Sequence, residues 1–180
     1  MKRFKQIKKF ANGKILDIGF ADFPNSTING LIGIDLKTTL KPSNYYSVSR
    51  ADALKIPFKK ESFDTVIASE LIEHLENASE FLRQCHSILK TGGHLLLSTP
   101  NPFYPPVIFF NLLMIKKFYF NDTHLNLFPP RIMFKLLKKN GFHLEKILPG
   151  SGIVFPTKSV FIIPFFKMLN QHLVYICKKI

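Results

Sequence analysis

The sequence predicts an α/β fold with a mostly parallel sheet, organised as a single domain over residues 1–180, because strand-like apolar runs alternate with helical segments. Two early runs, 14–18 and 31–36, are nearly continuously apolar and each delivers an acid near its end, as expected of strands buried on both faces. The closing run, 173–180, has no helix of useful length before it, which favours an antiparallel hairpin at the sheet edge. We therefore expect seven strands, an antiparallel edge strand and reduced helices.

The other elements follow in chain order. Only about a dozen residues separate the first two runs, so the helix between them can have no more than a turn or two. Strands are predicted at 45–48, 62–69, 94–99 and 142–148, and helices at about 75–90 and 129–140. Thr91-Gly92-Gly93 is interpreted as the signal that stops the first of these helices.

The charge is strongly positive, at a formal net +13, and the chain has 25 Lys and Arg residues against 12 acids. Arg contributes only Arg3, Arg50, Arg83 and Arg131, whereas phosphate and base recognition favours the Arg fork. A nucleic-acid partner is therefore not favoured. The first 13 residues are interpreted as a solvated basic arm, with Phe4, Ile7 and Phe10 spaced for one short amphipathic helix.

A cytoplasmic location is expected from the cysteines and from the hydropathy pattern. Cys85 and Cys177 have no C-x-x-C spacing and fit reduced, buried thiols. No apolar region of a secretory signal is visible, and no run reaches the roughly 18 apolar residues of a membrane span. The longest candidates, 107–115 and 160–169, are too short or are interrupted by Pro164 and Lys167.

Several motifs together resemble the class I S-adenosylmethionine-dependent methyltransferases, and their type 11 domain in particular. In the first strand an apolar run is followed by Asp17, Ile18 and Gly19, and the second strand ends near Asp35. The phrases Asp52-Ala53-Leu54, Ile56-Pro57-Phe58 and Ser62-Phe63-Asp64 are familiar in the type 11 family. A G-x-G-x-x-G fingerprint is absent, which argues against a dehydrogenase. The resemblance spans 14–148 and implies a Rossmann-like methyltransferase fold and an enzyme that uses S-adenosyl-L-methionine.

The resemblance also implies which residues contact this cofactor. The loop after the first strand would face the methionine part, Asp35 the ribose hydroxyls, and the acid after the third strand the adenine. The segment after the fourth strand would flank the cofactor and face the substrate. The predicted cofactor contacts are Asp17, Gly19, Phe20, Asp35, Leu36, Asp52, Ala53 and Glu70.

On the acceptor side, His124 is the candidate catalytic residue. It would serve as a general base if the acceptor is a weakly acidic hydroxyl; a histidine held in a loop hydrogen-bond network is an equally good interpretation. No metal site is expected, because Glu73-His74 lacks ligand spacing to Cys85 or His86.

The segments 101–127 and 150–171 are Pro- and aromatic-rich, and we expect them to be acceptor-side insertions outside the carboxyl ends of the strands. With nineteen Phe, five Tyr and no Trp, the chain favours a small or lipid-like acceptor, or docking of a Lys-rich surface to an anionic membrane. An AT-biased genome explains the same Phe and Lys excess equally well. A non-catalytic partner subunit of the same fold and an RNA methyltransferase stay open as alternatives, and the oligomeric state is undetermined.

Overall fold

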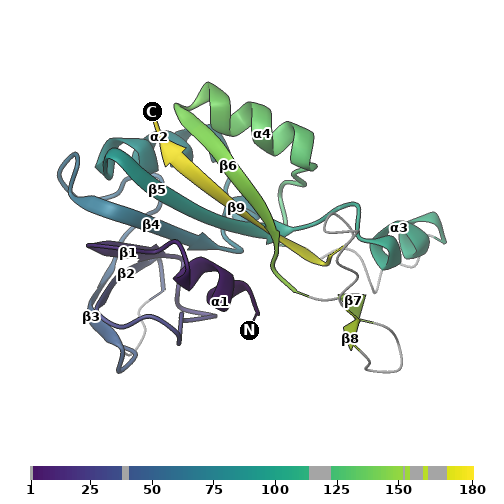
Figure 1. The fold of residues 1–180 in the computed structure, drawn as a ribbon, viewed down its shortest axis with the longest axis horizontal. Coiled ribbons are helices and arrows are strands. Elements are labelled where there is room, and N and C mark those ends of the chain that lie inside the picture. Colours follow the sequence, from purple (N-terminus) through teal and green to yellow (C-terminus); the bar gives the residue numbers. More distant parts are fainter. Residues whose placement is uncertain (1, 38–40, 114–122, 152, 155–159, 162–169) are drawn as a thin grey trace.

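Seven strands form one sheet in the order β3-β2-β1-β4-β5-β9-β6 (Figure 1). The computed structural model describes residues 2–37, 41–113, 123–151, 153–154, 160–161 and 170–180. The strands are β1 (Ile15–Ile18), β2 (Leu31–Asp35), β3 (Tyr45–Arg50), β4 (Phe63–Ser69), β5 (Leu89–Pro100), β6 (Phe142–Pro149) and β9 (His172–Lys179). A separate pair joins β7 (Ile153–Val154) to β8 (Val160–Phe161).

The first five strands of the sheet are parallel, and β9 pairs antiparallel with both β5 and β6. The predicted fold class is therefore confirmed, including the antiparallel hairpin at the edge. Within that hairpin the reversed strand β9 is the inner member, and β6 forms the edge itself.

The two faces of the sheet are covered unequally. On one face α2 (Ala78–Ile88) and α4 (Pro130–Lys139) bury Phe81, Leu82, Met133 and Leu137 against the strands. On the other face α1 (Lys2–Lys8) contributes Phe4 and Ile7. Successive strand residues supply both clusters, Val66 one and Ile67 the other, as the two-residue period of a strand requires.

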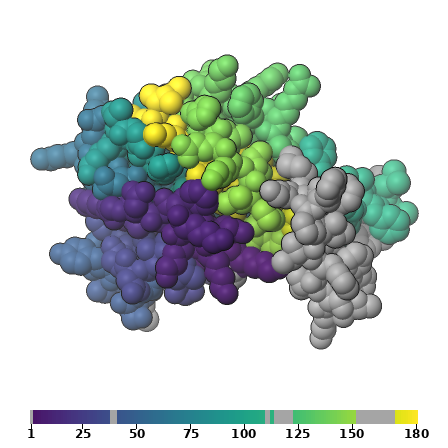
Figure 2. Space-filling model, in the orientation of Figure 1, coloured from purple at the N-terminus to yellow at the C-terminus, as the bar shows by residue number. Residues whose placement is uncertain are grey.

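The basic N-terminal segment is packed rather than solvated. Arg3, Phe4 and Ile7 are buried, while Lys2, Lys5 and Lys8 face solvent. Figure 2 shows the N-terminal residues, in purple, lying flush across the middle of the molecule. The helical spacing predicted for this segment is thus confirmed, and the expectation of a free arm is replaced by a helix held by its apolar face.

Two local predictions are corrected. Residues 19–30, between β1 and β2, form bends, so the predicted turn or two of helix is absent; the connection is at the lower length limit for a crossover between parallel strands. The Gly92-Gly93 pair lies inside β5 and not at a helix end: α2 already stops at Ile88, and the register against β4 shifts there. A Cβ on Gly93 would lie 2.9 Å from the carbonyl oxygens of Asp64 and Lys90, so the irregularity needs glycine.

Part of the predicted acceptor-side insertions is described. Residues 105–112 form α3 (Pro105–Leu112), which Figure 1 shows projecting from one end of the sheet. Residues 114–122 and most of 152–169 lie outside the described part of the chain. In the part that is described, no helix combines the length and apolar character needed to cross a bilayer.

Candidate active site

A cavity of about 810 Å³ opens at the carboxyl ends of β1, β2, β4 and β5. The chain winds from β1 to β2 and β3 on one side and then returns to β4 on the other, so the strand order reverses between β1 and β4. Ligands of open α/β sheets bind at such a reversal. Five predicted site residues line this cavity: Gly19, Asp35, Leu36, Glu70 and His124.

Gly19 forms the turn that lets the chain leave β1 at the cavity wall. Its φ is +74°, and its N–H donates to the carbonyl oxygen of Ile34 at 2.9 Å. A Cβ at this position would lie 2.9 Å from Leu71 Cδ1. Both the backbone conformation and the space available therefore require glycine.

Asp35 joins the end of β2 to the loop that follows β1. Its Oδ2 accepts from the Ala21 N–H at 2.9 Å, and its Oδ1 accepts from the Lys37 N–H at 2.8 Å. A carboxylate offers about four acceptor positions, so two stay available for ligand hydroxyls. Leu36 beside it is 59% exposed and borders the same cavity.

Asp17 and Phe20 point into the protein and not into the cavity. Asp17 is 3% exposed, and Tyr45 donates its phenolic O–H to the Asp17 carboxylate at 2.5 Å. Burial raises the pKa of Asp17 to about 7, although the hydrogen bond from Tyr45 opposes this. The Phe20 ring packs on the Tyr45 ring, with 5.0 Å between centroids. These two side chains therefore support the turn after β1 from the protein interior.

Asp52 and Ala53 do not line the cavity either. Asp52 accepts from the Leu54 N–H at 2.8 Å within its own turn, and Ala53 is buried in the core. The preceding Ala51 donates its N–H to the Asp35 carbonyl oxygen at 3.0 Å, so the backbone next to Asp52 lies beside the end of β2. Their predicted place near an adenine stays a prediction.

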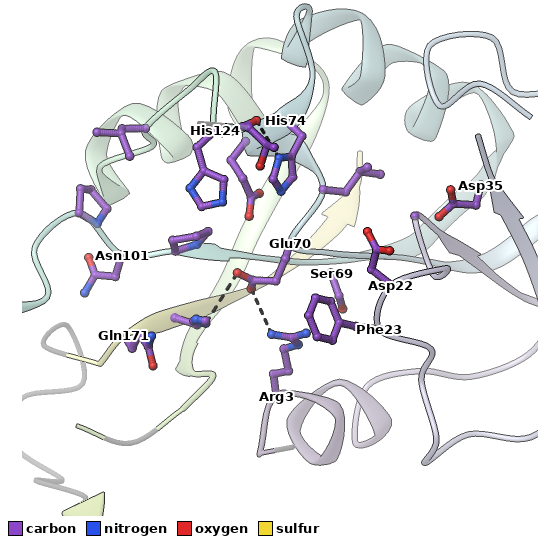
Figure 3. A pocket seen from close by; sticks show the side chains of 18 of the residues that line it. Arg3, Asp22, Phe23, Asp35, Ser69, Glu70, His74, Asn101, His124 and Gln171 are labelled. Carbon is purple, nitrogen blue, oxygen red and sulfur yellow. Dashed lines mark hydrogen bonds and ion pairs between the residues drawn. The ribbon is translucent and has the colours of Figure 1, made fainter. Parts of the chain in front are cut away.

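Glu70 follows β4 directly and has a left-handed backbone conformation, with φ 54°. Its Oε1 accepts from the Ser98 hydroxyl at 2.7 Å, and its carboxylate also lies 3.8 Å from Arg3 and 3.6 Å from His172 (Figure 3). Strained backbone of this kind is found where a functional side chain must be aimed. Arg3 and His172 were not predicted as site residues. The helical spacing of apolar residues in α1 was the available signal for Arg3, because that spacing packs the helix against the sheet.

The opposite wall carries Glu73, His74 and His124. The carbonyl oxygen of Thr123 accepts from His74 Nδ1–H at 2.8 Å, and the His74 and His124 rings lie edge to face at 4.7 Å. Burial and the neighbouring Glu70 raise the pKa of Glu73 to about 8, while burial and His74 lower that of His124. The imidazoles of His74 and His124 thus face the same space (Figure 3), and the buried Glu73 carboxyl borders it.

The residues present fit S-adenosyl-L-methionine. The glycine turn has no room for a side chain, the carboxylate of Asp35 lies where two hydroxyls can reach it, and the cavity is in the usual size range for a cofactor of this kind.

Known proteins of this type share the sequence features and the fold. A methyltransferase domain family model matches residues 5–147. The rat mitochondrial ubiquinone biosynthesis O-methyltransferase is 46% identical over 41 residues, which are 23% of this chain and 12% of that protein. A Mycolicibacterium smegmatis protein named as a probable S-adenosylmethionine-dependent methyltransferase is 30% identical over 116 residues, 59% of this chain and 40% of that one. The chain thus spans well under half of the length of these relatives.

Solved structures agree on the fold. An S-adenosylmethionine-dependent methyltransferase from Thermotoga maritima superposes with a TM-score of 0.76 at 18% identity, covering 99% of this chain and 88% of that one. One from Archaeoglobus fulgidus gives 0.68 at 21% identity, covering 98% and 91%. The family model, the sheet order and the cavity at the strand reversal lead to one conclusion: the chain belongs to the methyltransferase domain family, whose cofactor is S-adenosyl-L-methionine.

Proposed function

We propose that this protein transfers a methyl group from S-adenosyl-L-methionine to a hydroxyl of a small, lipid-like acceptor. When bound, the cofactor supplies an electrophilic methyl group on a sulfonium, so the protein has mainly to position the two reactants. The observation that carries the proposal is the placement of Gly19 and Asp35 together on the wall of one cavity, at the reversal of strand order.

Asp35 would hold the ribose. Its two carboxylate oxygens are already oriented by the backbone N–H groups of Ala21 and Lys37, so little ordering is needed on binding. The exposed Leu36 adds an apolar contact beside it.

The acceptor would bind on the far side of the cavity, where apolar residues join the polar lining. Pro102, Val107 and Leu127 belong to this wall, and α3 continues it to the surface. Large apolar side chains stay exposed there: Ile108 at 50%, Phe109 at 57% and Leu112 at 80%. An apolar helix next to a binding cavity supports a lipid-like acceptor and contact with a membrane surface. Lys116 and Lys117, which suggested an anionic membrane, lie outside the described residues.

His124 would activate the acceptor hydroxyl. It lies on the cavity wall away from Asp35, beside His74. An imidazole in this place can take the proton directly or can hold an ion that lowers the pKa of the hydroxyl. The short matches to ubiquinone biosynthesis O-methyltransferases support oxygen as the methylated atom.

Calorimetry with S-adenosylhomocysteine tests the cofactor half of the proposal. Asp35→Ala should lose a charge-assisted contact of about 1.5–3 kcal/mol, roughly 10- to 150-fold in affinity. Asp22→Asn is the matched control, because Asp22 borders the same cavity but is exposed and paired with Lys37.

Wild-type protein that does not bind S-adenosylhomocysteine would instead support a non-catalytic partner subunit. Retention on RNA that survives moderate salt would favour the RNA methyltransferase alternative, because mere charge attraction is lost as salt rises.

A further inference from the structure

We propose that Glu73, His74 and His124 form a binding site for one divalent transition-metal ion of the zinc, cobalt or nickel kind. One nitrogen of each ring and one oxygen of the Glu73 carboxylate all lie within 4.8 Å of one another. Two ligand atoms about 2.1 Å from a shared ion at a tetrahedral angle are about 3.4 Å apart, so side-chain rotations of modest size close the site.

The Glu73 carboxyl is buried beside the cavity and is poorly satisfied by the described part of the chain. It is 1% exposed, and although a contact with Thr99 lowers its pKa against the larger effect of burial, neither oxygen makes a hydrogen bond of good geometry to a described residue. A poorly satisfied buried carboxyl is costly, and a cation in the cavity that it borders would satisfy it.

His74 is already in the form that binds a metal. Because the Thr123 carbonyl oxygen can only accept, Nδ1 must carry the hydrogen of their 2.8 Å bond. The lone pair therefore resides on Nε2, and the backbone contact fixes the ring, as the outer contacts of metal-bound histidines do.

The segment that carries His124 is fixed to the other two ligands. The N–H groups of Leu125 and Asn126 both donate to the Glu73 carbonyl oxygen, at 2.9 and 3.0 Å. The Asn126 side-chain amide donates to the Leu75 carbonyl oxygen at 2.7 Å. Glu73 and His124, distant in sequence, are thus held together by the backbone, which is the preorganisation that a metal site requires.

The donor set selects the ion. Two imidazoles and one carboxylate suit borderline transition metals, whereas Mg²⁺ and Ca²⁺ prefer oxygen ligands. Three protein ligands leave a coordination position for a substrate oxygen, as in catalytic zinc sites. The expectation of no metal site considered Cys85 and His86 as partners; Cys85 is buried in the core, and the third ligand comes from residue 124 instead.

This inference rests on the proposed function only for the use of the ion, not for its binding. Binding is measured by titrating chelator-treated protein with Zn²⁺ in a calorimeter and with Co²⁺ by visible absorption. We expect one ion per chain, and affinity at least about tenfold weaker in Glu73→Gln, His74→Ala and His124→Ala. His143→Ala is the matched control, because His143 is exposed on β6, outside the cluster. Excess Mg²⁺ should not displace the ion.

Equal Zn²⁺ affinity in wild type and His124→Ala, or no Zn²⁺ binding by the wild type at about 100 μM, would overturn the site. Circular dichroism checks that each variant folds, and if Glu73→Gln does not, the two histidine variants carry the test. S-adenosylhomocysteine binding by the same metal-free samples is measured in parallel. Zn²⁺ binding without S-adenosylhomocysteine binding would support the metal site and contradict the proposed function. S-adenosylhomocysteine binding without Zn²⁺ binding would support the proposed function and contradict the metal site.

Discussion

The two walls of the cavity are built in different ways. We call the wall proposed to hold the cofactor the cofactor wall, and the wall proposed to hold the acceptor the acceptor wall. The cofactor wall consists of strand ends and their turns, joined by short contacts such as Gly19 to Ile34 and Ala21 to Asp35. The acceptor wall joins η1 (Ile72–His74), the segment 123–127 and α3, which lie outside the sheet and are distant in sequence. The sheet register therefore fixes the cofactor wall, whereas the acceptor wall depends on loops that can change without disturbing the sheet.

The largest effect should come from the acceptor wall. His124→Ala is expected to lower turnover by about 10²–10⁴-fold while affinity for S-adenosylhomocysteine stays unchanged, because His124 lies across the cavity from Asp35 (Figure 3). Single-turnover methyl transfer and calorimetry on the same variant separate the two quantities. Loss of cofactor affinity together with turnover would mean that the walls are not independent.

A pH dependence of stability should arise beneath the cofactor wall. Because burial raises the pKa of Asp17 to about 7, from 3.8, the folded state holds a proton there that the unfolded chain releases between these values. The Asp17 contribution is therefore fully present below about pH 4 and is lost, by a few kcal/mol, as pH rises to about 7. Asp17→Asn should flatten this part of the pH profile.

Urea unfolding at intervals from pH 4 to 8 measures this profile for both proteins. The difference between wild type and Asp17→Asn isolates Asp17 from the other buried acids. Parallel curves for the two proteins would mean that Asp17 is ionised in the folded state.

A smaller effect is expected at the outer end of the acceptor wall. If α3 meets a membrane, Phe109→Asp should reduce sedimentation with anionic vesicles, since one large apolar side chain contributes about 1.5–3 kcal/mol when buried. Tyr46→Asp is the control, because Tyr46 is an exposed aromatic residue on β3, away from α3. Recovery of the wild type in the supernatant with both anionic and neutral vesicles would contradict membrane binding. The positive charge would then serve only the solubility of the protein.

The smallest effect concerns the exposed rim of the cofactor wall. Lys37 pairs with Asp22 at 2.6 Å, but both side chains are more than half exposed. Lys37→Ala should leave S-adenosylhomocysteine affinity close to that of the wild type, with any difference shrinking as salt rises. A loss as large as that of Asp35→Ala would place Lys37 on the ligand itself.

Residue patterns along the chain are enough to predict the sheet and one wall of the cavity. Apolar runs that end in Asp17 and Asp35 predict adjacent buried strands, and because parallel strands end at one edge, Gly19 and Asp35 had to meet. The free, buried state of Cys85 and Cys177 also follows from their spacing and is observed, while the cytoplasmic location inferred from it stays a prediction.

Which acids face the cavity, and which residues lie opposite them, depends on how the whole chain packs. Asp17 and Asp35 look alike in sequence, yet β1 is buried on both sides and directs Asp17 to Tyr45, whereas the end of β2 opens to the cavity. Arg3 comes to Glu70 because α1 packs on the sheet, and His124 comes to Glu73 through backbone bonds to a distant loop. No local pattern encodes such contacts, because their spacing depends on how the whole chain closes around its core.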